Sequence, residues 1–160
     1  MLPLETLHTI AEVGIAITGF AGIVTAIRGE AGRAIQASVT DPLSLLFGSS
    51  LGTVFFCFVP EWLDAALDST EIVWQASLAA FGTYRIAYVA LIVVSQRRAG
   101  IPDPVVWRAR FGIGLGSLQL LGAAGFLSDY QYFLYLSGLF WGLVVALTSF
   151  YSLIRDPSAD

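Results

Sequence analysis

The chain alternates between long apolar segments and short polar connections. Five apolar segments of about 18 residues or more, 10–27, 43–60, 72–94, 111–128 and 130–154, contain only Glu12 and Arg85 as charged residues. A hydrocarbon layer of about 30 Å needs roughly 20 apolar residues in a helix that rises about 1.5 Å per residue. The pattern therefore predicts an all-α polytopic membrane protein, a bundle of five transmembrane helices over residues of approximately 9–28, 42–60, 71–95, 108–128 and 130–154.

The arginine residues predict the orientation of this bundle. Seven of the eight follow the first, third or fifth segment, and they are Arg28, Arg33, Arg97, Arg98, Arg108, Arg110 and Arg155. Cytoplasmic connections carry an excess of basic residues. We therefore expect the N-terminus outside and the C-terminus in the cytoplasm. A four-span arrangement would break the alternation of basic residues, so we predict five spans.

Composition agrees with a membrane protein of one domain. Hydrophobic residues make up 56% of the chain and charged residues 12%, against about 25% charged residues in soluble domains. Five spans within 160 residues leave no room for a separate soluble domain, so residues 1–160 form a single transmembrane domain. Without a basic tract, we expect the lipid bilayer and no nucleic acid as a partner.

The sequence offers little for catalysis or metal binding. His8 is the only histidine and Cys57 the only cysteine, so a multi-residue zinc site and an internal disulfide are both excluded. No cluster provides a nucleophile, a base and oxyanion donors together. We predict that the protein is not an enzyme and has no catalytic residue, cofactor or metal.

Small residues recur at helical spacing. Three glycine pairs are four residues apart within apolar segments, namely Gly48 and Gly52, Gly112 and Gly116, and Gly138 and Gly142. Four-residue spacing places both glycines on one helix face, where they allow close approach of another helix. We expect a tight bundle, with these faces packed inside one protomer or between protomers.

Glu12 and Arg85 are the two charges inside the five apolar segments. If the first helix starts near Pro3 and the third near Glu71, Glu12 lies about 13 Å and Arg85 about 21 Å into the membrane at about 1.5 Å per residue. The difference is within reach of an extended arginine, and an unpaired charge at mid-bilayer costs about 3 kcal/mol or more. We predict an intramembrane ion pair, either as a structural lock between the first and third segments or as a gate.

Two uncharged polar residues belong to the predicted interior. Gln119 shares a helix face with Gly112 and Gly116, so we expect it to form a hydrogen bond across a tight helix interface; lining a wet pathway is the alternative. Thr18 lies on a face of small residues in the first segment.

Four acidic residues follow Pro60 in the connection between the second and third segments: Glu61, Asp64, Asp68 and Glu71. On one helix their spacing would place them within about 80° of one another. Pro60 either kinks the second segment or begins a short interfacial helix. The outer acidic stripe is either a solvated face or a vestibule that concentrates cations.

Several short motifs carry a resemblance. Residues 5–13 read ETLHTIAEV, residues 19–24 read GFAGIV, and residues 50–56 and 141–143 read SLGTVFF and WGL. The chain resembles a group of small bacterial multi-span integral membrane proteins that begin with similar patterns and have no known activity. The resemblance implies a multi-pass protein of the bacterial inner membrane and carries over no functional residue.

Three function classes follow. We favour a homo-oligomeric channel that conducts cations along a narrow gated pathway, because few interior residues are polar and the outer connection is acidic. The first alternative is a small non-catalytic subunit that docks onto a larger membrane complex. The second is a small proton-coupled transporter with Glu12 as the coupling carboxylate.

Overall fold

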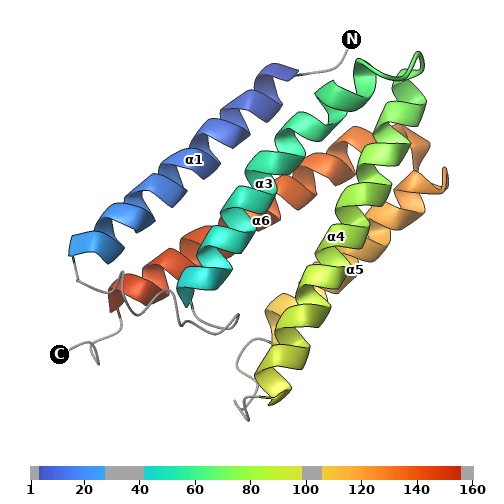
Figure 1. Ribbon diagram of the computed structural model, residues 1–160. Helices are drawn as coiled ribbons and strands as arrows, with labels where there is room; N and C mark the ends of the chain where they lie inside the picture. The colour runs from blue at the N-terminus through green and yellow to red at the C-terminus, as the bar shows by residue number, and fades with distance from the viewer. Residues whose placement is uncertain (1–3, 28–41, 99–105, 156–160) are drawn as a thin grey trace.

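The computed structural model describes residues 4–27, 42–98 and 106–155, and the described residues form helices and turns without strands. The helices are α1 (Leu4–Ile27), α3 (Pro42–Asp64), α4 (Thr70–Arg98), α5 (Val106–Ala123), the 3-10 helix η1 (Ser128–Tyr130) and α6 (Gln131–Arg155). The predicted all-α fold class is therefore confirmed (Figure 1).

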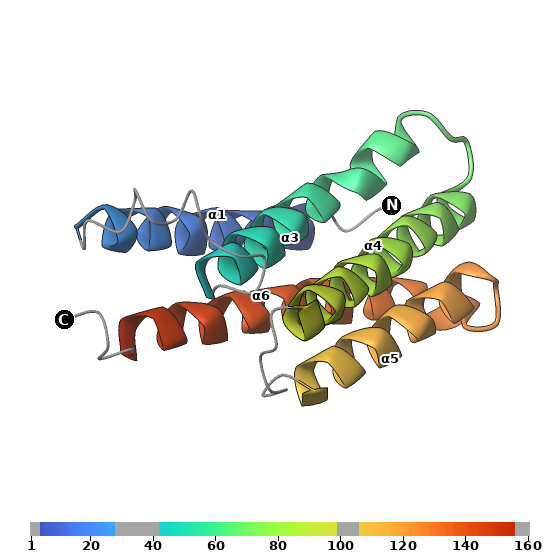
Figure 2. The same cartoon turned by 60° about the horizontal axis from the view of Figure 1, so that its bottom comes forward.

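Successive α-helices run in opposite directions along the bundle, so α1, α4 and α6 are antiparallel to α3 and α5 (Figure 1). The helices α3 and α6 pack against each other, and both contact α1 and α4. The helix α5 packs against α4 and α6. Figure 2 shows α1 and α5 on opposite sides of the bundle.

Four helices are long and apolar enough to cross a membrane, and they are α1, α3, α4 and α6. The fifth, α5, has 18 residues and carries Arg108 and Arg110 in its first two turns. By length and composition, the described residues therefore support four of the five predicted spans.

The outer surface of the bundle is apolar on each of the five α-helices in the described ranges. Large hydrophobic side chains such as Phe20, Phe55, Leu91, Phe111 and Phe140 are each more than half exposed. Soluble monomers rarely expose apolar surface on this scale. The exposed side chains of α5 resemble those of the other four described α-helices in this respect, and the surface as a whole suits contact with lipid.

The fourth predicted span, 108–128, is too long at its C-terminal end. Gly125 has a φ of 87°, a left-handed conformation that glycine adopts without strain. The Phe126 amide bonds the Leu121 carbonyl and the Gly125 amide bonds the Gly122 carbonyl, both at 3.2 Å. These two bonds form a Schellman motif, which ends α5 at Ala123 inside an apolar run.

Pro60 lies inside α3, and the helix continues for one more turn to Asp64. No interfacial helix begins at Pro60. A proline has no amide hydrogen, so the Phe56 carbonyl four residues earlier loses its partner within the helix. The Tyr135 hydroxyl of α6 donates a hydrogen bond to that carbonyl. A neighbouring helix thus satisfies the backbone group that proline frees.

Candidate functional site

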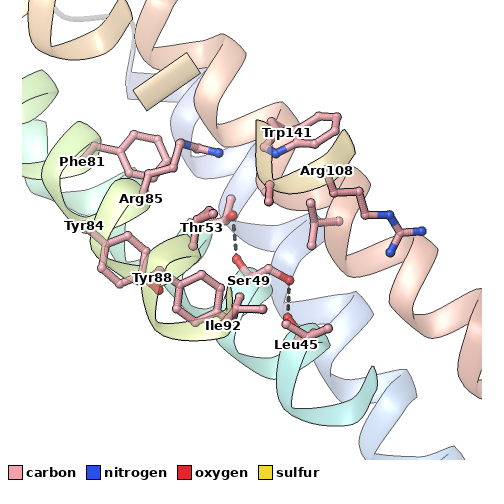
Figure 3. Close-up of a pocket in the computed structure, with 14 residues that line it drawn as sticks. Leu45, Ser49, Thr53, Phe81, Tyr84, Arg85, Tyr88, Ile92, Arg108 and Trp141 are labelled. Atoms are coloured by element: carbon pink, nitrogen blue, oxygen red, sulfur yellow. Dashed lines mark hydrogen bonds between the residues drawn. The ribbon is translucent and has the colours of Figure 1, made fainter. Parts of the chain in front are cut away.

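A cavity of about 90 Å³ lies between α3, α4, α5 and α6 (Figure 3). Its lining runs from Phe81 and Arg85, near the middle of α4, to Ile92 on the same helix and Arg108 at the start of α5. The cavity therefore occupies the half of the bundle that holds the end of α4 and the start of α5.

Arg85 is the charged group at the inner end of this cavity, with only 7% of its surface exposed. Its Nη2 atom donates a hydrogen bond of 2.6 Å to the Gly138 carbonyl of α6, and its Cζ atom lies 4.7 Å from the centroid of the Phe81 ring. Its Nε atom has no hydrogen-bond partner among the described residues. No described carboxylate forms a salt bridge with Arg85.

Glycine residues allow the helices to approach around Arg85. A Cβ atom at Gly138 would lie 3.0 Å from Nη2 of Arg85 and 2.8 Å from Cε1 of Phe81, and it would meet Nε2 of Gln119 closer still. A Cβ atom at Gly82 of α4 would lie 2.9 Å from the carbonyl oxygen of Gly116. The three helices α4, α5 and α6 therefore meet at glycine positions beside the arginine.

Gln119 of α5 is fully buried in this region. Its Nε2 atom donates a hydrogen bond of 3.3 Å to the Leu134 carbonyl of α6, as expected for a glutamine at a tight helix interface. Its Oε1 atom has no hydrogen-bond partner among the described residues. Thr18 is not among the residues that line the cavity. Its hydroxyl donates a hydrogen bond of 2.8 Å to the Ser50 hydroxyl of α3 in a partly buried contact.

The α3 wall of the cavity carries hydroxyl groups that bond within their own helix. Ser49 donates a bond of 2.6 Å to the Leu45 carbonyl, and Thr53 donates one of 2.8 Å to the Ser49 carbonyl; Figure 3 shows this chain of bonds. On α4, the rings of Tyr84 and Tyr88 stack with centroids 5.8 Å apart.

Charged side chains separate to opposite ends of the bundle. The arginine end holds Arg97 and Arg98 at the end of α4 and Arg108 and Arg110 at the start of α5. The acidic end holds Glu5, Glu61, Asp64, Asp68, Glu71 and Asp129. Arg28 and Arg33, which contribute to the predicted orientation, lie outside the described residues.

The predicted ion pair between Glu12 and Arg85 is not formed among the described residues. Glu12 lies on the exposed face of α1, and Arg85 is buried against α6. The depths of Glu12 and Arg85 along their helices are compatible with a pair. However, α4 packs mainly on α3, α5 and α6 rather than on α1, which carries Glu12. The rotation of α1 then directs Glu12 away from the bundle interior.

The spacing of the four acidic residues predicted one helical stripe, and the structure does not form it. Glu61 and Asp64 belong to the last turn of α3, Asp68 lies in the connection, and Glu71 is in the first turn of α4. The helix α3 ends at Asp64, and α4 begins at Thr70, directly after Ser69, a residue type that favours the position before a helix. All four nevertheless lie at the acidic end.

Two of these carboxylates have partners. Glu61 Oε2 lies 3.1 Å from His8 Nε2, which joins α1 to α3, and Glu71 accepts a hydrogen bond of 3.2 Å from Gln75. No group of three or more potential metal ligands occurs among the described residues.

The six paired glycines face neighbouring helices of the same chain. Gly48 and Gly52 of α3 face the Tyr88 and Tyr84 rings. Gly112 and Gly116 of α5 face α4, and Gly142 of α6 faces Thr53 of α3. Close packing within one protomer therefore accounts for these three motifs.

The sequence alone did not show which residues contact Arg85 or line the cavity. The Gly138 carbonyl, which accepts the bond from Arg85, belongs to a glycine pair that predicted only packing. Arg85 itself was the available signal, because a buried arginine requires hydrogen-bond acceptors. A buried guanidinium with unused donors beside a cavity is a group that can bind an anion.

No protein-family model, curated protein or solved structure matches this chain.

Proposed function

We propose that the protein is a membrane transport protein that binds a small anion inside its helix bundle, with Arg85 as the binding cation. The observation that carries this proposal is an arginine with only 7% of its surface exposed, one carbonyl acceptor and no described carboxylate partner. Removing such a charge from water costs several kcal/mol. Arginine inside a membrane domain typically marks a substrate or ion pathway.

The packing of the bundle supports a gated pathway. The hydrophobic core fills the half nearest the acidic end, where Phe56, Trp74, Phe81 and Tyr135 pack together. The cavity occupies the opposite half and reaches Arg108. An anion would therefore enter from the arginine end and reach Arg85, and the aromatic core would have to rearrange before it could leave at the other end.

Five spans and an inner-membrane location belong to the same proposal. The helix α5 is about 27 Å long at 1.5 Å per residue, close to the hydrocarbon thickness. Arg108 and Arg110 near its start are able to extend toward the membrane surface. The separation of arginine and acidic ends supports a cytoplasmic arginine end, and the sequence resemblance supports a bacterial inner membrane.

Flux from proteoliposomes tests the proposal. We expect the purified protein to carry at least one small anion under an applied potential, from a panel of chloride, nitrate, acetate, butyrate and phosphate. The Arg85→Gln variant should lose this flux, whereas Arg98→Gln, at an exposed position outside the cavity, should retain it. Flux of potassium or sodium alone, independent of Arg85, would contradict the proposal.

A homo-oligomeric cation channel is the second candidate, and one observation favours assembly. Glu12, Ala16 and Gly19 are exposed on the same face of α1, and a carboxylate that faces lipid is costly. A second protomer, or a subunit of a larger complex, would cover this face. A cation pathway would then run between protomers, because the interior charge at Arg85 is positive. Disulfide crosslinking of Gly19→Cys in membranes separates a homo-oligomer from a docking subunit.

A further inference from the structure

The hydrogen-bond donors of the cavity are few, and this limits the charge of an anion that it can hold. Ser49 and Thr53 use their hydroxyl hydrogens within α3, and Tyr84 donates a bond of 3.3 Å to the Gly48 carbonyl. Tyr88 and Trp141 also line the cavity, and each carries one neutral donor. Arg85 is the one cation at the inner end of the cavity. In Figure 3 the Arg108 guanidinium points away from Arg85.

The donors that Arg85 retains suit a single carboxylate. A guanidinium has five N–H donors, and the described contacts use one of them at Nη2. The Nε hydrogen has no partner among the described residues. A carboxylate can accept two parallel bonds from one guanidinium, which would satisfy Nε and a neighbouring Nη together.

The other walls are mainly apolar, with aliphatic side chains beside the aromatic rings of Phe81, Tyr84, Tyr88 and Trp141. Leu45, Val89, Ile92, Ala109 and Val145 come from four helices and line the cavity between Arg85 and Arg108. A phosphate or sulfate on Arg85 would direct its remaining charged oxygens at these side chains. Buried oxygens without donors are costly, so a ligand with one charged end and an apolar body fits better.

The cavity size sets the length of that body. The volume of about 90 Å³ is larger than the roughly 10–15 Å³ that a cavity needs to hold one water molecule. It is smaller than the roughly 150 Å³ cavity that holds benzene in an engineered protein. A ligand of a few carbon atoms therefore matches the space.

We infer that the cavity binds a short-chain aliphatic monocarboxylate, with its carboxylate on Arg85 and its alkyl chain against Val89, Ile92 and Val145. This inference rests on the proposed function, because it names the class of anion that the Arg85 site takes. The hydrogen bond from Arg85 to Gly138 holds the guanidinium at the inner end, and the alkyl chain excludes water from the carboxylate.

Equilibrium binding to the purified full-length protein in detergent tests the inference. The probes are sodium butyrate, sodium formate, sodium phosphate, sodium chloride and butylammonium chloride, which has the same body and the opposite charge. We expect butyrate to raise the unfolding temperature and to bind more tightly than formate, with no shift from phosphate or butylammonium. Arg85→Gln should weaken butyrate binding by about tenfold or more, and Arg98→Gln should not.

A second variant keeps the test valid if Arg85→Gln does not fold. Val145→Phe retains the arginine and fills the space of the alkyl chain, so it should reduce butyrate affinity more than formate affinity. Equal affinities for formate and butyrate, or tighter binding of phosphate or chloride, would overturn the monocarboxylate inference and leave an anion site at Arg85. If no anion binds the wild-type protein, both the inference and the proposed function are wrong.

Discussion

Arg85 is the residue at which stability and function conflict. Its guanidinium is buried with one carbonyl acceptor, one aromatic contact with Phe81 and an Nε atom without a described partner. An apolar side chain of similar length would avoid the desolvation cost of the charge. Natural proteins retain such destabilising groups mainly at functional sites, and this supports a binding role for Arg85.

Substitution of Gly138 should disturb the arginine directly. In Gly138→Ala the added methyl group would meet Arg85, Phe81 and Gln119, all within 3.0 Å. Overpacking of this kind typically costs about 1–3 kcal/mol, and the guanidinium would have to move from its carbonyl acceptor. We expect a lower unfolding temperature in detergent and weaker anion binding.

Gly114→Ala is the matched control for Gly138→Ala. Gly114 is exposed on α5 and a Cβ atom there meets nothing within 4 Å, so alanine should keep or slightly raise stability through its higher helix propensity, by up to about 1 kcal/mol. Equal losses in the two variants would show that the environment of Gly138 is not specially tight.

Glu12 and Arg85 should behave as independent residues. Glu12 is exposed and Arg85 bonds α6, so removal of one does not leave the other without a partner. The effects of Glu12→Gln and Arg85→Gln on unfolding should therefore add within about 0.5 kcal/mol in the double variant. A larger coupling energy would restore the ion pair that the sequence predicted.

At the residue scale the sequence identified Arg85 and Gln119 as polar residues of the interior but could not give their partners. Depth along a helix follows from counting residues, whereas the direction of a side chain depends on how each helix is rotated. Gly138 and Leu134 accept these hydrogen bonds through their backbone carbonyls. Every residue has a backbone carbonyl, so the residue type does not show which one accepts a bond.

At the scale of the helices, Pro60 and Tyr135 form one unit across two elements. The proline frees the Phe56 carbonyl, and the tyrosine hydroxyl bonds it. Tyr135 is fully buried in the aromatic core, so water has little access to this carbonyl. The contact therefore lets α3 continue through a proline and fixes α3 against α6.

A double-mutant cycle tests this unit. Tyr135→Phe should destabilise the protein by about 1–3 kcal/mol, because it leaves the Phe56 carbonyl buried without a donor. In a Pro60→Ala background the amide of the new alanine can bond that carbonyl within the helix, so the same substitution should cost less. The measurement is thermal or denaturant unfolding of the four proteins in one detergent. Equal costs in both backgrounds would mean that the hydroxyl does not replace the missing amide.

Hydropathy predicted where each helix lies but not where each one ends. Each of the five apolar runs coincides with one α-helix of the described ranges, because burial and lipid contact both require apolar side chains. Helix ends depend on local hydrogen bonds instead. The Schellman motif at Gly125 ends α5 within an apolar run, and α1 begins at Leu4, before the first apolar run, so that it includes Glu5 and His8.

At the scale of the whole molecule, the charge distribution agrees with the alternation in the sequence. Because successive helices are antiparallel (Figure 1), the connections after α3 and α5 lie at one end, and the ends of α1, α4 and α6 lie at the other. The acidic and arginine ends follow from this arrangement. The sequence could predict the separation because it depends only on the number and order of the helices.

Accessibility of introduced cysteines tests the orientation of the bundle. We expect the arginine end in the cytoplasm, since basic residues are retained there. In a Cys57→Ala background, a cysteine at Asp68 should react with a membrane-impermeant thiol reagent in intact cells. A cysteine at Arg98 should react only after the membrane is permeabilised. Both positions are exposed, so a difference in labelling reports on the side of the membrane. Labelling of Arg98→Cys but not Asp68→Cys in intact cells would reverse the orientation, and the cavity would then open to the outside.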